Sequence, residues 1–121
     1  MNNAIQQMKA EILQALAHPT RIAIVEELRK GETSAGALIS QLGLDQANAS
    51  QHLALLRARQ IVSHRKAGSQ VFYSLHDPAL GEVLELLRQI CKRRLEESVH
   101  LLEEMGKEQV ERHTSGPGVA R

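Results

Sequence analysis

Amide and hydroxyl side chains are concentrated in one short stretch of the chain, directly after Asp45. They are Gln46, Asn48, Ser50, Gln51 and His52. A carboxamide presents a hydrogen-bond donor and an acceptor together, the pairing that selects adenine in the major groove of DNA. Serine and histidine can bind bases or phosphates. If this stretch is helical, its outer face carries groups suited to base-pair edges, whereas an ordinary solvated face usually carries Glu and Lys.

The distribution of charge indicates a surface that faces an anion. The net charge is only +1, yet no Asp or Glu occurs between Gln46 and His76, where several Arg and Lys residues lie. The commonest anion for such a basic stretch is a phosphate backbone. Chance clustering of solvated charges is the alternative that charge alone leaves open. The further candidate DNA contacts are Ser34, Arg57, Arg65, Lys66, Ser69 and Gln70.

Apolar spacing predicts four helices before residue 60. Pro19, Ser34 and Asp45 mark the starts of the last three, Pro19 as a first helical residue and the other two as N-caps. Gly31 and Gly43 mark helix ends. The fourth helix is expected to turn an apolar stripe inward, which leaves its amide side chains outward; the stripe is Ala49, Leu53 and Leu56.

After residue 60 the pattern changes to short runs of strand-forming residues. Residues 61–66 and 70–75 predict a two-stranded β-hairpin, or wing, with a positive φ angle at Gly68. Between the third and fourth helices, residues 42–45 can reverse the chain at Gly43. The expected fold class is therefore mainly α with a β-hairpin wing. It is a winged helix-turn-helix, in which four helices precede two strands and a last helix, and its fourth helix projects toward a major groove.

A long last helix is predicted from Pro78 to Met105, with Asp77 as its cap. Its apolar stripe is too long for a small domain to cover, so we expect a homodimer in which the first helix packs across the partner's last helix. Packing of both stripes within one chain is the alternative. Residues 1–106 are expected to form this domain, and residues 107–121 a flexible C-terminal tail. The expected interface residues are Ile5, Met8, Ile12, Leu80, Leu84, Leu87 and Cys91.

Over residues 10–90 the chain resembles the ArsR/SmtB-type bacterial transcriptional repressors. The resemblance implies a cytoplasmic homodimer that binds a palindromic operator in double-stranded DNA and is usually released by an effector. It also implies a dimer interface formed by the first and last helices. Gln60 replaces the glycine that usually follows the recognition helix. The segments that carry the resemblance are residues 15–21 (ALAHPTR), 34–38 (SAGAL), 43–53 (GLDQANASQHL) and 71–75 (VFYSL).

The chain departs from this family at the positions of its metal ligands. The family's sensors use thiolates on the third helix, or Asp, His and Glu on the last helix. Those positions are occupied here by Thr33, Ser34 and Ala35, and by Asp77, Ala79, Ile90 and Arg93. Neither set can hold a metal, so no metal, no cofactor and only an unknown effector are expected. An alternative metal site is formed by side chains that repeat every fourth residue, Glu96, His100 and Glu104.

The single cysteine, Cys91, cannot form an intramolecular disulfide, which fits a reducing cytoplasm. An interchain disulfide between two copies would make the protein a redox-responsive repressor, although a cysteine in an apolar stripe is usually inert. This is one alternative function.

Composition and motifs exclude several other classes. No apolar run reaches the roughly 18–20 residues of a membrane helix, and the polar N-terminus lacks the pattern of a signal peptide. No nucleophile elbow, phosphate-binding loop or zinc-protease motif occurs, so an enzyme is not expected. A winged-helix module that binds proteins rather than DNA is the second alternative function.

Overall fold

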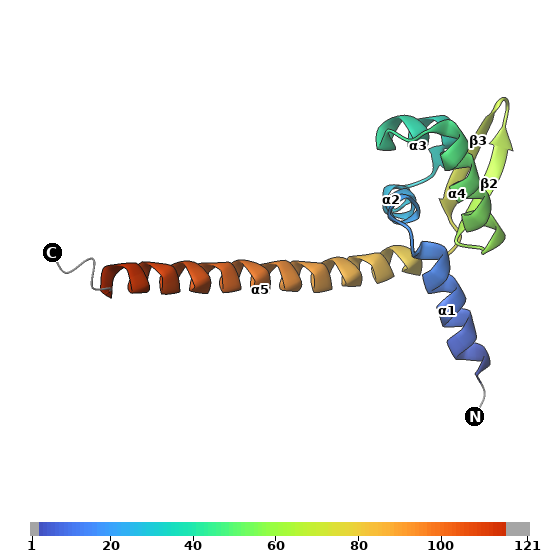
Figure 1. Cartoon of the computed structure of the whole chain (residues 1–121). Coiled ribbons are helices and arrows are strands. Elements are labelled where there is room, and N and C mark those ends of the chain that lie inside the picture. The colour runs from blue at the N-terminus through green and yellow to red at the C-terminus, as the bar shows by residue number, and fades with distance from the viewer. Residues whose placement is uncertain (1–2, 116–121) are drawn as a thin grey trace. The chain divides into compact units, whose positions relative to one another are not determined.

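The computed structural model describes residues 3–115, and this part contains five helices and three strands (Figure 1). The chain divides into two compact units, residues 1–84 and residues 85–121, which are described separately. None of the helices in residues 3–115 combines the length and the apolar character that a membrane-spanning helix needs. The helices are α1 (Ala4–Leu16), α2 (Pro19–Leu28), α3 (Ala35–Leu42), α4 (Gln46–Ala58) and α5 (Ala79–Ser115). The strands are β1 (Thr33–Ser34), β2 (Val62–Ala67) and β3 (Gln70–Leu75).

Side-chain caps fix the starts of the three helices in the middle of the first unit. The Thr20 backbone N–H donates to Nδ1 of His18, which places Pro19 at the first position of α2. Ser34 Oγ accepts from the backbone N–H of Ala37 at 3.1 Å and so caps α3. These bonds satisfy backbone donors that a helix start leaves unpaired, and the predicted starts of α2 and α3 are confirmed.

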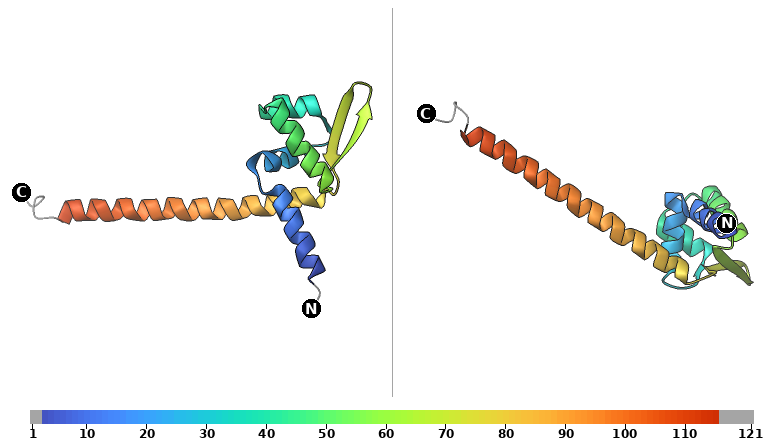
Figure 2. Two further views of the ribbon diagram at one scale, coloured as in Figure 1. Left: turned by 45° about the vertical axis from the view of Figure 1, so that its right-hand side comes forward. Right: turned by 90° about the horizontal axis from the view of Figure 1, so that it is seen from below.

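The sheet has three strands in the order β1-β3-β2, so the predicted two-stranded wing was incomplete. The hairpin itself is confirmed: Val62 pairs with Leu75 and Ala67 with Gln70, around a turn in which Gly68 has a φ of 64°. The strand that the sequence did not predict, β1, pairs with β3. It is only two residues long, which is too short to show an alternating pattern in the sequence. The hairpin lies beside α4, and its tip projects beyond the helices (Figures 1 and 2).

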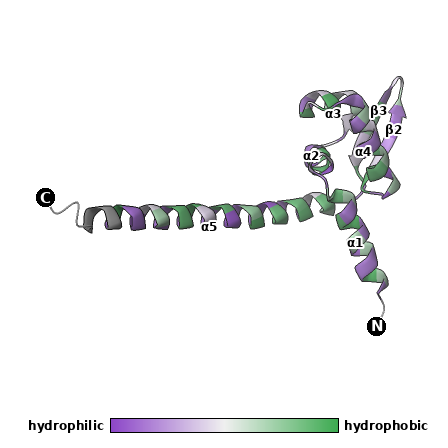
Figure 3. Cartoon of the chain, in the orientation of Figure 1, coloured by the Kyte–Doolittle hydropathy of each residue, from purple (hydrophilic) through white to green (hydrophobic). Residues whose placement is uncertain are grey.

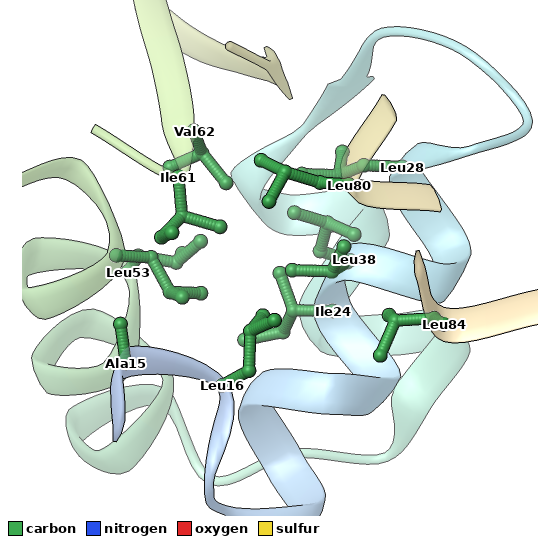
Figure 4. Packing of buried hydrophobic residues seen from close by; sticks show 12 residues of the cluster. Ala15, Leu16, Ile24, Leu28, Leu38, Leu53, Ile61, Val62, Leu80 and Leu84 are labelled. Carbon is green, nitrogen blue, oxygen red and sulfur yellow. The ribbon is translucent and has the colours of Figure 1, made fainter. Parts of the chain in front are cut away.

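The core of the first unit is built from every helix and from the start of β2 (Figure 4). Ile24 of α2, Leu38 of α3 and Leu56 of α4 are completely buried. Ile61 and Val62 bring the base of the wing into the same cluster. The core therefore fixes α4 and the hairpin against α2 and α3 through apolar burial.

Helix α5 begins at Ala79, whose backbone N–H donates to Oδ1 of Asp77 at 2.9 Å. It continues past Gly106 to Ser115, so the predicted end at Met105 was wrong. One glycine costs a helix only about 1 kcal/mol relative to alanine, and the residues on both sides of Gly106 are good helix formers. Residues 116–121 of the predicted tail lie outside the described residues.

The end of α4 holds a residue in a conformation that favours glycine. Gln60 has a φ of 59°, and its neighbour Ile61 donates its backbone N–H to the Leu56 carbonyl, which closes the helix. Left-handed backbone costs a side-chain-bearing residue about 1 kcal/mol.

We therefore predict that Gln60→Gly raises the free energy of unfolding by about 0.5–1 kcal/mol, measured by urea denaturation. Gln41→Gly, inside α3, is the control and should lower it.

Candidate nucleic-acid interface

The amide side chains after Asp45 lie on the exposed face of α4, as predicted. Ala49, Leu53 and Leu56 are buried, and their spacing of three and four residues turns one face of the helix inward. The opposite face is therefore presented to solvent over the first two turns. Its exposed residues are Gln46, Ala47, Asn48, Ser50 and Gln51.

The turn before α4 sets the direction of this face. Gly43 ends α3 in the left-handed region with a φ of 61°, and the Leu44 backbone N–H donates to the Ile39 carbonyl at 3.0 Å. Leu44 packs against the core, and Asp45 Oδ2 accepts from the backbone N–H of Asn48 at 3.1 Å. Helix α4 therefore starts immediately after the reversal, with the positive end of its dipole beside the exposed amides.

His52 does not share the exposed face with those amides. Its ring centroid lies 4.4 Å from that of His18, and its Nδ1 is 3.4 Å from Nη1 of Arg21. Burial lowers the pKa of His52, and the neighbouring His18 and Arg21 lower it further. Arg21 also donates from Nε to the carbonyl of Ala15. His52 thus joins α4 to the start of α2, and Arg21 continues the link to the end of α1, contacts that the sequence pattern did not predict.

Arg65, predicted as a DNA contact on the wing, is already bound within the chain. Its Nε and Nη2 donate to both carboxylate oxygens of Glu32 at 2.8 and 2.7 Å, and its guanidinium lies 4.8 Å from the centre of the Phe72 ring. The hydrogen bond from Arg65 lowers the pKa of Glu32, and Glu32 in turn raises the pKa of Arg65. This bidentate pair anchors β2 to the segment before β1.

The tip of the wing exposes the remaining predicted contacts of the hairpin. Lys66, Ser69 and Gln70 surround the turn at Gly68 and are all exposed. In the last turn of α4, the exposed Arg57 lies with Nη1 3.2 Å from Nε2 of His64 on β2. Ser34 is occupied as the cap of α3. The first unit therefore presents two polar surfaces, the start of α4 and the wing tip.

The predicted dimer residues fall into two groups, and one group contradicts the prediction. Leu80 and Leu84 are buried in the core of their own chain, with 9% and 4% of their surfaces exposed, so they cannot form an interface. A helical stripe alone does not tell a core-facing position from an interface position. The other predicted residues remain exposed: Ile5, Met8, Ile12, Leu87 and Cys91.

Potential metal ligands do not converge anywhere in residues 3–115. No group of three or more His, Cys, Asp or Glu side chains is placed to hold an ion in this part of the chain. The alternative site at Glu96, His100 and Glu104 was therefore wrong. Side chains that repeat every fourth residue on one helix face are spread along it and need ligands from a second element to enclose an ion.

The fold and this interface define a winged helix-turn-helix protein of the regulator class, in which the second helix of the helix-turn-helix, α4, presents its polar face to solvent. Residues 16–65 match the family described as "Helix-turn-helix domain". Three similar proteins extend the match beyond that segment.

The first is the uncharacterized HTH-type transcriptional regulator Rv0081 of Mycobacterium tuberculosis, which is 37% identical over 84% of this chain and 90% of its own length. Its crystal structure superimposes with a TM-score of 0.71, at 36% identity, over 81% of this chain and 99% of that one. The transcriptional repressor SmtB of the same species is 39% identical over 61% of this chain and 55% of its own. The crystal structure of the transcriptional repressor BigR of Xylella fastidiosa has a TM-score of 0.65 at 33% identity, over 74% and 96% of the two chains. The chain belongs to the ArsR/SmtB-type family of helix-turn-helix transcriptional regulators.

Proposed function

We propose that this regulator binds double-stranded DNA by inserting the start of α4 into a major groove. One observation carries the proposal: an uncharged face of amides and a hydroxyl is exposed at a capped helix start, while the apolar face of the same helix is buried. Gln46, Asn48 and Gln51 are assigned to base edges and Ser50 to a base or phosphate. Lys66, Ser69, Gln70 and Arg57 are assigned to the phosphate backbone.

The proposal extends to a homodimeric repressor in the cytoplasm. Exposed apolar residues lie on α1 in the first unit, and Leu87 and Cys91 are exposed in the second; each of these sets is a surface that a second copy would cover. Two recognition helices in one dimer would read successive major grooves of a palindromic operator, spaced by about 34 Å. The proposed activity is binding of the operator, which requires no catalytic step, metal or cofactor of the chain.

We predict that Gln51→Ala weakens binding to the cognate operator by about 1–3 kcal/mol, because one bidentate base contact is lost. Genomic fragments retained by the purified protein supply that operator, and electrophoretic mobility shifts measure the affinity. Non-specific binding should change little. Gln89→Ala, which removes the same group from α5, is the matched control. Equal weakening on random-sequence DNA would contradict the assignment of Gln51 to a base.

Titration against salt separates this proposal from a protein-binding module. A dimer that neutralises several phosphates loses affinity with a log–log slope of about −0.9 per phosphate contact. A winged helix that binds proteins instead would retain no DNA fragments and show no such slope.

A further inference from the structure

An acidic residue, Glu32, lies beside the basic stretch of the wing and binds one of its cations. Strand β2 is largely hydrophilic (Figure 3), and two adjacent cations lie on it, Arg65 and Lys66. By charge alone, both are suited to a phosphate backbone. The structure distinguishes them, because they lie on different faces of the hairpin and have different neighbours.

The faces of the hairpin follow from the alternation of side chains along a strand. Val62 is buried at the base of β2, and Lys66 shares its face. His64 lies on that face too, with Nε2 3.2 Å from Nη1 of Arg57 in the last turn of α4. This face is therefore turned toward the helix, and Arg65 lies on the other one.

On that outer face, Arg65 reaches across the central strand of the sheet. It pairs with Phe72 of β3, and β1 lies on the far side of β3. The guanidinium lies over the Phe72 ring and donates two hydrogen bonds to the carboxylate of Glu32, directly before β1. Two hydrogen bonds and one cation–π contact therefore hold the same group.

Glu32 is also held from its own side. The next residue, Thr33, donates from Oγ1 to the Gly31 carbonyl at 3.0 Å and pairs with Tyr73 in the sheet. Exposed ion pairs are usually weak, and bidentate geometry between two fixed backbones is the favourable exception. We therefore expect the pair between Glu32 and Arg65 to persist beside DNA.

We infer that Glu32 withholds Arg65 from DNA, so that the wing makes its charged contact with phosphate through Lys66. This inference rests on the proposed function, since it concerns the wing of the DNA-bound protein. The carboxylate cancels the charge of the guanidinium before a phosphate is met, so Arg65 releases no counterion when DNA binds. Glu32 thus lowers both the affinity for DNA and its salt dependence without touching DNA.

The test measures binding of the full chain to a random-sequence duplex at several salt concentrations, by fluorescence anisotropy. Glu32→Gln should steepen the log–log slope by about 0.9 for each wing that touches DNA, because the amide no longer cancels the charge of Arg65. Arg65→Gln alone should leave the slope unchanged, whereas in the Glu32→Gln background it should remove the added 0.9. Glu26→Gln makes the same charge change on α2 and should keep the wild-type slope.

Two results would overturn the inference. One is a Glu32→Gln slope equal to that of the wild type. The other is a slope about 0.9 shallower in Arg65→Gln alone, which would show that Arg65 already contacts phosphate. Lys66→Gln should flatten the slope by about 0.9 per wing whether or not Glu32 has this role, so it tests the proposed function separately. Wild-type binding without salt dependence would contradict the proposed function itself.

A measurement without DNA checks that the pair forms in solution. The hydrogen bond from Arg65 lowers the pKa of Glu32, so Arg65→Gln should raise the pH at which this carboxyl titrates, followed by carbon-13 NMR. An unchanged titration would also overturn the inference. Circular dichroism checks that each variant keeps its fold, since neither Glu32 nor Arg65 lies in the core.

Discussion

Leu84→Glu should unfold the first unit rather than only separate two protomers. Leu84 has 4% of its surface exposed and packs in the core with Leu80 and Ile24 (Figure 4). A carboxylate there is buried without a partner, which costs about 4 kcal/mol or more of unfolding free energy. We expect loss of the cooperative thermal transition at neutral pH, followed by circular dichroism.

Leu87→Glu is the matched control, because the same change falls three residues later on α5 at a side chain that is 42% exposed. Its thermal transition should remain, and any change should appear in the association of protomers. Both variants must be compared at one protein concentration, since a dimer's apparent stability depends on it. A folded, monomeric Leu84→Glu would contradict the placement of Leu84 in the core.

Leu56→Ala should lower the free energy of unfolding by about 2–5 kcal/mol, the range found when a fully buried leucine is truncated. Leu56 is completely buried on the inner side of α4, so the change leaves a cavity behind the proposed recognition face without altering that face. Urea denaturation measures the loss. Where the variant remains folded, its affinity for the operator should stay close to that of the wild type.

The neighbouring residue provides the control for this prediction. Leu55 is on the same helix with 37% of its surface exposed, and Leu55→Ala should lower the free energy of unfolding by less than about 1 kcal/mol. Equal losses for the two substitutions would show that Leu56 is not the core contact described above.

Features that depend on near neighbours could be predicted from the sequence. The caps of α2, α3 and α4, the left-handed Gly43 and the turn at Gly68 all follow from a few adjacent residues, and the structure has each of them. The inward stripe of α4 follows from helical periodicity, so the exposure of Asn48 and Gln51 opposite to it also follows.

Features that depend on distant residues could not be predicted in this way. The pair between Glu32 and Arg65 joins residues 33 positions apart, and the contact between Arg21 and His52 spans 31 positions. Nothing local marks either pair. For the same reason the stripe on the last helix did not reveal that Leu80 and Leu84 face their own core, since period alone does not identify what covers a face.

The three-stranded sheet and the helix-turn-helix share one residue, Ser34. That residue ends β1, where it pairs with Phe72 of β3, and its side chain also caps α3. The pairing with β3 and the cap of α3 therefore meet in one residue, with no linker between the sheet and the helix. We therefore expect a substitution of Ser34 to disturb both the edge of the sheet and the start of α3.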